Sequence, residues 1–240
     1  MLTFKAARAI SLATVLLVDD LVNDEVLTHA SPRARIIHVG KRGGCTSTPQ
    51  SLILKLMVQE AQKGESVVRL KGGDPFIFGR GGEEIEYLQT AGITVKVVNG
   101  ITSGLAAASA LNIPLPHRDT AHGVVFITGH NKPGDAGIDW TALSACAHQA
   151  KLTMVIYMGV SSATSITEGL RHGLPGNTPV AIVQNASLST QRHVICELDA
   201  LVSTLVCEHL SSPSVIIVGN VLSGLAQLQL QKNTELLAAA

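Results

Sequence analysis

Residues 67–84 read VVRLKGGDPFIFGRGGEE, and the rest of the chain can be placed around them. Val67, Val68 and Leu70 predict a short buried strand, because β-branched and aliphatic side chains suit a pleated, buried surface. Lys71-Gly72-Gly73 ends that pattern, and glycine, which has no Cβ, can adopt positive φ and lets a ligand approach the backbone. The stretch therefore predicts a strand that runs into a glycine-rich binding loop.

The loop leads directly into a helix. Asp74-Pro75 predicts a turn, and the apolar residues 76–78 follow where loops are usually polar, which favours a flat, apolar partner packed on them. Glycines on both sides of Arg80 carry it to the helix start, where Glu83 and Glu84 suit the positive end of the helix dipole. A tight strand-to-helix turn with a satisfied Asp74 would also fit these residues.

The composition is that of a globular chain without a global charge. Its 240 residues can bury a substantial core in one large or two smaller domains, with 46% hydrophobic and 15% charged residues. Lys plus Arg and Asp plus Glu both number 18, so no net field draws the chain to nucleic acid or to a membrane surface. A polyanionic ligand would have to be bound by locally placed arginine and lysine side chains.

Cysteine spacing and the N-terminal residues favour a cytoplasmic protein. The cysteines are Cys45, Cys146, Cys196 and Cys207. They form no CxxC pair and have no histidine at ligand spacing, so neither a zinc site nor a disulfide framework is predicted. The apolar run at 9–18 leads directly into Asp19-Asp20 without a small-residue cleavage site, which argues against a signal peptide. Gly, Ser, Asn and Pro between residues 98 and 116 argue against a membrane span.

Strands and helices alternate in the first half of the chain. Strands are predicted at 14–18, 35–39, 67–70 and 94–98, and helices at 3–13, 49–64, 83–91 and from 100 onward. This alternation predicts right-handed βαβ units around a parallel sheet. Ligands bind outside the carboxyl ends of such strands, so Asp19 should point at the same crevice as the glycine loop. Free N–H groups at the start of the helix after Gly100 could hold a polar ligand group.

A joint divides the chain near its middle. Pro114, Pro116 and the polar stretch at 117–123 predict one domain at 1–119 and a second at 120–240. In the second half, strands are predicted at 124–127, 152–157, 179–184, 191–197 and 214–218, and helices near 139–146, 161–172 and 198–209. A short turn joins the strands at 179–184 and 191–197, so we expect them to pair antiparallel and make this sheet mixed.

The sequence resembles a known family along most of its length. Residues 67–84 are similar to the signature loop of uroporphyrinogen-III C-methyltransferases, which are tetrapyrrole methylases that use S-adenosylmethionine. The resemblance continues through VGKR at 39–42, GITSG at 100–104, IPLPHRD at 113–119, ITGH at 127–130, YMG at 157–159 and SPSVIIVG at 212–219. It implies an α/β fold with a parallel sheet in the N-terminal domain, a mixed sheet in the C-terminal domain and the donor site in the cleft between them. It also implies a cytoplasmic homodimer without metal, nucleic-acid or membrane partners.

The implied reaction is methylation of uroporphyrinogen III by S-adenosylmethionine, twice, through precorrin-1 to precorrin-2, for sirohaem, cobalamin or haem d1 synthesis. The residues that match the family's donor contacts are Gly72, Gly73, Asp74, Ile77, Thr102, Ser103, Met158 and Ala186. Ser103 replaces an alanine, and Ala186 replaces a glycine, which adds a methyl group where a backbone contact is expected. Met158 taken alone would also fit a core position.

Two further sets of residues follow from the resemblance. Uroporphyrinogen III carries eight carboxylates, and the planar fork of arginine pairs with carboxylate through two bonds. Arg80 and Arg118 match the family's substrate arginines, and Glu83 matches a glutamate beside them, although such charges are usually solvated. Asp19 and Lys41 match the family's proposed proton acceptor and proton donor. Such roles are needed because methylation of a pyrrole carbon must be followed by proton loss. A strand-end aspartate such as Asp19 is otherwise often a helix cap.

The second acid and the start of the chain leave alternative readings of the function open. Asp20 places a second acid beside Asp19, near a polyacidic substrate. A methylase of the same fold could act on another acceptor, such as a later corrin precursor, a translation factor or ribosomal RNA. Arg80, Arg118, Asp19 and Lys41 together argue against this. Family members also begin with a strand and a GxGPGDP loop before the helix that Thr3 opens, whereas Met1 follows both. An inactive, truncated subunit with an exposed strand edge is therefore the third expectation.

Overall fold

The computed structural model describes residues 1–40, 48–130, 134 and 137–224. The chain forms two compact units, Met1–Thr102 and Ser103–Ala240. The boundary predicted between 119 and 120 lies later in the chain than this division, because helix α4 (Ser103–Ala110) packs against strands β5 and β8 of the second unit.

The first unit contains a parallel sheet, as predicted. Its elements are α1 (Phe4–Leu12), β1 (Val15–Val18), the 3-10 helix η1 (Asp24–His29), β2 (Arg35–His38), α2 (Gln50–Gln62), β3 (Val67–Leu70) and α3 (Gly81–Thr90). The strands in the described part of this unit pair in the order β2-β1-β3, with β1 parallel to both neighbours. The middle strand β1 is fully buried.

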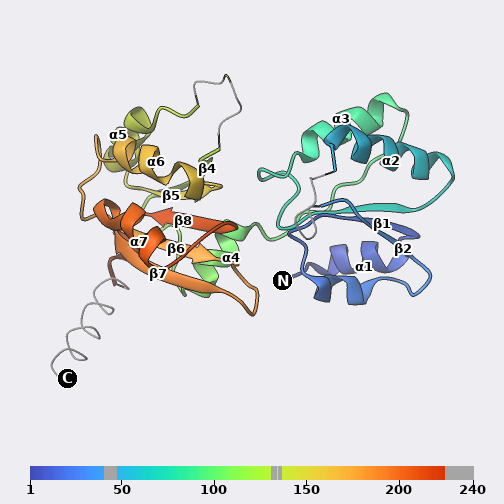
Figure 1. The fold of residues 1–240 in the computed structure, drawn as a ribbon, viewed down its shortest axis with the longest axis horizontal. Coiled ribbons are helices and arrows are strands. Elements are labelled where there is room, and N and C mark those ends of the chain that lie inside the picture. The colour runs from blue at the N-terminus through green and yellow to red at the C-terminus, as the bar shows by residue number, and fades with distance from the viewer. Residues whose placement is uncertain (41–47, 131–133, 135–136, 225–240) are drawn as a thin grey trace. The chain divides into compact units, whose positions relative to one another are not determined.

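Helices cover both faces of this sheet (Figure 1). Alternate residues of β1 point to opposite faces. Val15 and Leu17 pack with Ile53 of α2 and Leu88 of α3. Leu16 and Val18 form a second cluster with Ile10 of α1, and residues of η1 pack against it. The first unit is therefore a three-layer α/β/α sandwich, and the predicted α2 helix between Pro49 and Gly64 forms one of its outer layers.

The strand predicted at 94–98 is wrong, because this segment joins no ladder among the described residues. Its side chains nevertheless alternate between partly buried and exposed, and Val95 packs with Ile93 against the α2 side of the core. The alternating sequence pattern reports this burial. A strand also needs a hydrogen-bonded neighbour, which such a pattern does not reveal.

The second unit contains a mixed sheet, which confirms the prediction for this half. Its elements after α4 are β4 (Gly123–Thr128), α5 (Trp140–Gln149), β5 (Leu152–Tyr157), η2 (Val160–Ser162), α6 (Ala163–Leu170), β6 (Pro179–Gln184), β7 (Arg192–Glu197), η3 (Leu198–Ala200), α7 (Leu201–Cys207), β8 (Ser214–Val218) and η4 (Asn220–Leu222). The strand order is β4-β5-β8-β6-β7. β4 and β5 are parallel, β8 is antiparallel to β5 and β6, and β6 pairs antiparallel with β7 as predicted.

Helices α5, α6 and α7 cover one face of the mixed sheet, where Met154, Ile182 and Ile216 lie in the main core cluster. On the opposite face α4 approaches β5 so closely that a Cβ on Gly104 would lie 2.7 Å from the Val155 side chain. None of the helices in the described ranges is long and apolar enough to cross a membrane.

The layered packing of the first unit predicts a large stability difference between two leucines. Leu16 in β1 is 0% exposed, whereas Leu12 at the end of α1 is 66% exposed. We expect Leu16→Ala to lower the free energy of unfolding by about 2–5 kcal/mol, because it leaves a cavity in a close-packed core. The matched control Leu12→Ala should change it by less than about 0.5 kcal/mol.

Urea denaturation followed by circular dichroism measures both changes. Fluorescence of Trp140, the chain's one tryptophan, follows the second unit and shows whether the loss is confined to the first. Equal losses from the two substitutions would contradict the packing described for β1.

Candidate active site

The segments that follow the three parallel strands meet at one edge of the first sheet. A Cβ on Gly40, after β2, would lie 2.3 Å from the backbone nitrogen of Asp20, after β1. A Cβ on Gly72, after β3, would lie 2.7 Å from the carbonyl oxygen of Leu21. Only glycine permits these approaches. The segments that carry Asp19 and the glycine loop therefore meet at this edge of the sheet.

The side chain of Asp74 joins two loops at this edge. Its Oδ1 accepts the Phe76 N–H at 2.8 Å, and its Oδ2 accepts the Gly100 N–H at 3.0 Å. The two loops are so close that a Cβ on Gly100 would lie 1.9 Å from the carbonyl oxygen of Gly73. Gly73 itself has a φ of +77°, which favours glycine. The carboxylate of Asp74 is thus satisfied internally, and the loop conformation is fixed without a ligand.

The loop presents two kinds of surface. Gly72 and Gly73 are exposed and offer backbone without side chains. Phe76 and Phe78 are 52% and 40% exposed, so the apolar segment predicted to receive a flat partner does reach the surface. Phe78 also has a φ of 53°, which is uncommon for a residue with a Cβ and is typical of functional loops.

Arg80 and Glu83 lie together at the start of α3. Arg80 forms the N-cap in the left-handed conformation, and Glu83 and Glu84 occupy the first turn, as predicted. The Arg80 Nε donates to Glu83 Oε1 at 3.1 Å, and the two side chains are 54% and 53% exposed. The arginine fork is therefore on the surface and already oriented by a carboxylate.

Beneath Asp19 lies a network of buried charges that the sequence analysis missed. Arg69 NH2 contacts Asp19 Oδ2 at 3.0 Å, and Arg69 Nε contacts Glu84 Oε1 at 3.3 Å. Lys71 Nζ also contacts Glu84 Oε1, at 3.0 Å, and burial lowers the pKa of Lys71 below its usual value. The sequence signal that could have revealed this network is Arg69, a cation inside the otherwise apolar strand β3. Asp19 is not a helix cap, because Asn23 caps η1.

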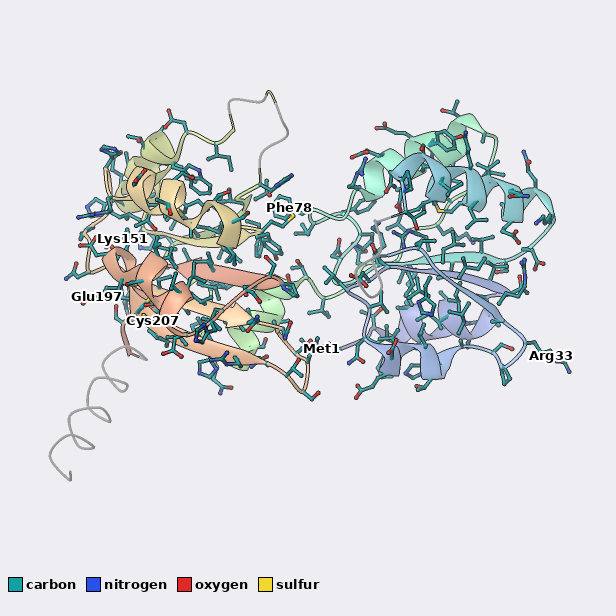
Figure 2. The ribbon with its side chains drawn as sticks, viewed as in Figure 1. Met1, Arg33, Phe78, Lys151, Glu197 and Cys207 are labelled. Atoms are coloured by element: carbon teal, nitrogen blue, oxygen red, sulfur yellow. The ribbon has the colours of Figure 1, made fainter. Side chains whose placement is uncertain are left out.

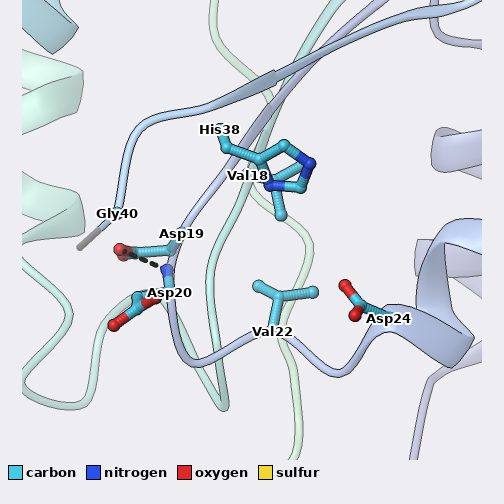
Figure 3. Close-up of a pocket in the computed structure, with 7 residues that line it drawn as sticks. All are labelled: Val18, Asp19, Asp20, Val22, Asp24, His38 and Gly40. Carbon is cyan, nitrogen blue, oxygen red and sulfur yellow. Dashed lines mark hydrogen bonds between the residues drawn. The ribbon is translucent and has the colours of Figure 1, made fainter. Parts of the chain in front are cut away.

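A small cavity opens beside Asp19 (Figure 3). Its volume is about 360 Å³, and it is lined by Val18, Asp19, Asp20, Val22, Asp24, His38 and Gly40. Three carboxylates therefore surround it, and Asp20 is the additional acid noted in the sequence. Among the described residues, no group of three or more His, Cys, Asp and Glu side chains is placed to hold a metal ion.

The second unit has its own edge of converging loops. β4, β5 and β6 run in the same direction, so Gly129, Met158 and Asn185 follow their carboxyl ends at one edge. A Cβ on Gly129 would lie 2.6 Å from the Cα of Gly159. Met158 is 45% exposed with a φ of 53°, so it is not a core residue. Asn185, directly before the partly buried Ala186, has a φ of 51°.

The N–H groups around the start of α4 are partly occupied, which corrects the prediction that they are free. Gly100 donates to Asp74, and Gly104 donates to the buried hydroxyl of Tyr157 at 2.9 Å. Thr102 is buried and Ser103 is partly buried.

The predicted site residues therefore fall into groups. The first unit holds Asp19, Gly72, Gly73, Asp74, Ile77, Arg80, Glu83 and Thr102, and the second holds Ser103, Arg118, Met158 and Ala186. Arg118 is exposed beside the bridge between His117 and Ala121. Lys41 lies outside the described residues.

The two bonds of Asp74 predict a graded loss of stability. Asp74→Ala leaves the N–H groups of Phe76 and Gly100 without their acceptor, so we expect the free energy of unfolding to fall by about 1–3 kcal/mol while the chain still folds. Asp74→Asn keeps one oxygen acceptor and should lose less. Urea denaturation measures this, with Asp119→Ala, whose side chain is 79% exposed, as the matched control. Wild-type stability for Asp74→Ala would contradict the described role.

Comparison with known proteins identifies the family. The family model of the Tetrapyrrole (Corrin/Porphyrin) Methylases matches residues 1–202. A uroporphyrinogen-III C-methyltransferase of Pseudomonas aeruginosa is 46% identical over 222 residues, which are 92% of this chain and 88% of that protein. Siroheme synthase 1 of Aeromonas hydrophila is 45% identical over 224 residues, 93% of this chain and 47% of that protein, so the chain spans about half of its length.

A solved structure supports the same family. The crystal structure of uroporphyrin-III C-methyl transferase from Thermus thermophilus complexed with S-adenyl homocysteine matches with a TM-score of 0.74 and 34% identity, covering 92% of each chain. The two-unit fold, the glycine loop and these likenesses together show that the chain belongs to the tetrapyrrole methylases.

Proposed function

We propose that this protein methylates uroporphyrinogen III with S-adenosylmethionine as methyl donor, forming precorrin-2 by way of precorrin-1. The observation that carries the proposal is the placement of an exposed glycine loop, locked by Asp74, beside Asp19 at one edge of the parallel sheet. Substrate identity is supported by the 46% identity to the Pseudomonas aeruginosa uroporphyrinogen-III C-methyltransferase over 92% of this chain. The same reaction serves sirohaem, cobalamin and haem d1 synthesis.

The residues present fit the methyl donor. S-adenosylmethionine combines polar groups with a flat adenine, and it supplies a methyl group already activated on a positive sulfonium. Gly72 and Gly73 expose bare backbone for polar contacts, and a side chain at Gly73 would be strained at φ +77°. Phe76 and Phe78 offer apolar surface nearby in the chain. We include Ile77, Thr102, Ser103, Met158 and Ala186 among the donor contacts on the strength of the family resemblance.

The task of the protein in such a transfer is placement and proton handling. Each transfer breaks a carbon–sulfur bond, whose electron pair stays on sulfur, and forms a carbon–carbon bond at a pyrrole carbon. The ring then loses one proton. Asp19 is the proposed acceptor of that proton, because its carboxylate is partly exposed at the edge where the glycine loop ends. Lys41 is the proposed proton donor.

Surface arginines are the proposed partners of the substrate carboxylates. The Arg80 fork is exposed and pre-oriented by Glu83, and Arg118 is exposed in the second unit. Arg69 and Lys71 have side chains only 10% and 9% exposed and are engaged with acids, so they are unsuited to this role.

We also propose that the protein is a cytoplasmic homodimer. The apolar residues Phe4 and Leu12 of α1 are 98% and 66% exposed, and a second copy is one surface that could cover such side chains. Cys146, Cys196 and Cys207 are free thiols, which suits a reducing compartment. Light scattering of the purified protein reports its oligomeric state.

Arg80→Ala tests the proposed substrate contact. We expect its KM for uroporphyrinogen III to rise about tenfold to a hundredfold, because a charge-assisted hydrogen bond is worth about 1.5–3 kcal/mol. The affinity for S-adenosylhomocysteine, measured by calorimetry, should stay within about twofold, since the donor contacts are untouched.

The assay is anaerobic transfer of labelled methyl groups to uroporphyrinogen III, with product absorbance in parallel. Arg33→Ala is the matched control, because Arg33 is exposed and lies at the opposite end of the first unit from Phe78 (Figure 2). Transfer by the wild-type protein to another acceptor but not to uroporphyrinogen III would overturn the proposed substrate. An unchanged KM in Arg80→Ala would remove Arg80 from the site.

A further inference from the structure

Arg69 occupies an unusual place for a charged residue. It lies within the four-residue strand β3, between Val68 and Leu70, and its side chain is 10% exposed. Burying a guanidinium is costly unless its N–H groups are paired, so the identity of its partners shows what the position is used for.

Three of the four contacts of Arg69 are with fixed groups. NH1 donates to the carbonyl oxygens of Leu17 at 3.4 Å and Leu70 at 3.1 Å, so the backbones of β1 and β3 orient the guanidinium plane. Nε donates to Oε1 of Glu84 at 3.3 Å.

Glu84 is itself held firmly. Its side chain is 6% exposed, and the same Oε1 accepts Gln50 Nε2 at 2.9 Å and Lys71 Nζ at 3.0 Å. Gln50 begins α2 and Glu84 lies in the first turn of α3, so the guanidinium is set by two strands and two helices.

The fourth contact is with a side chain that reaches the surface. NH2 donates to Asp19 Oδ2 at 3.0 Å, and Asp19 Oδ1 accepts the Asp20 N–H at 3.0 Å. The Asp19 side chain is 35% exposed and lines the cavity in Figure 3. Both carboxylate oxygens are therefore held from within, while the group remains accessible.

We propose that Arg69 is a positioning residue, which fixes the carboxylate of Asp19 in the orientation that accepts a proton from the methylated pyrrole. This inference rests on the proposed function. Glu84 engages both Lys71 and the Nε of Arg69. Lys71 Nζ lies 4.0 Å from Asp19 Oδ2, whereas NH2 of Arg69 donates to that oxygen at 3.0 Å, so Arg69 is the cation that directly holds Asp19. Buried ion pairs contribute little to net stability compared with apolar replacements, so orientation is the better reason for this arrangement.

A purely structural role, tying β1 to β3, makes a different prediction, and a double-mutant cycle separates the two. The variants are Arg69→Met, Asp19→Asn and the double substitution. If Arg69 acts through Asp19, Arg69→Met should lower kcat about a hundredfold in the wild-type background. It should change kcat by less than about twofold in the Asp19→Asn background, because nothing is left to position.

One binding measurement and two further variants separate positioning of Asp19 from a general loss of structure. Affinity for S-adenosylhomocysteine should stay within about twofold in every variant, since donor contacts are intact. Arg69→Lys keeps the charge but loses the fork, so its kcat should lie between those of wild type and Arg69→Met. Arg35→Met, which removes a different ion pair on the same sheet, with Glu60, should leave kcat unchanged.

Equal kcat losses from Arg69→Met in both backgrounds would overturn the proposal, as would wild-type kcat in Asp19→Asn. Should Arg69→Met fail to fold, Arg69→Lys completes the same cycle with the same criterion. Absence of methyl transfer in the wild-type protein would instead overturn the proposed function, and it is measured first.

Discussion

The carboxylate of Asp74 is the interaction on which the site in the first unit depends. By accepting the N–H groups of Phe76 and Gly100, it closes the glycine loop on itself and joins it to the segment that leads into α4. The joint works only because Gly100 has no side chain where its backbone meets that of Gly73, and because Gly73 can adopt a φ of +77°. A loop that orders only when its ligand arrives costs binding free energy, and this one is ordered beforehand.

Charge placement at the same edge follows a related constraint. Two cations and two anions, Arg69, Lys71, Asp19 and Glu84, meet where strands and helices of the first unit converge. Their formal charges cancel, so the network can lie inside the protein while only Asp19 extends to the cavity. A transfer that ends with proton loss needs one accessible base in a fixed place, and this arrangement leaves one. Arg80 makes its ion pair with Glu83, outside these four residues, and both side chains are exposed.

Sequence patterns predicted those features that depend on local order. The glycine loop, the parallel first sheet and the antiparallel pairing of β6 with β7 all follow from runs of neighbouring residues. What the patterns missed depends on partners far apart in the chain. The segment at 94–98 has the burial of a strand but no ladder in the described structure, and Arg69 finds Asp19 across 50 positions. Asp74 was predicted as a donor contact, and the structure adds that its oxygens hold the loop by accepting the N–H groups of Phe76 and Gly100.

Amide hydrogen exchange at Gly100, followed by NMR on the ligand-free protein, tests most directly whether the glycine loop is locked before any ligand binds. Because its N–H is donated to Asp74, Gly100 should exchange far more slowly than an unprotected peptide. Phe76 should be protected as well, and both should lose protection together in Asp74→Ala. Exchange of Gly100 at the unprotected rate, with protection appearing only after S-adenosylhomocysteine is added, would show that the loop is not locked before ligand binding.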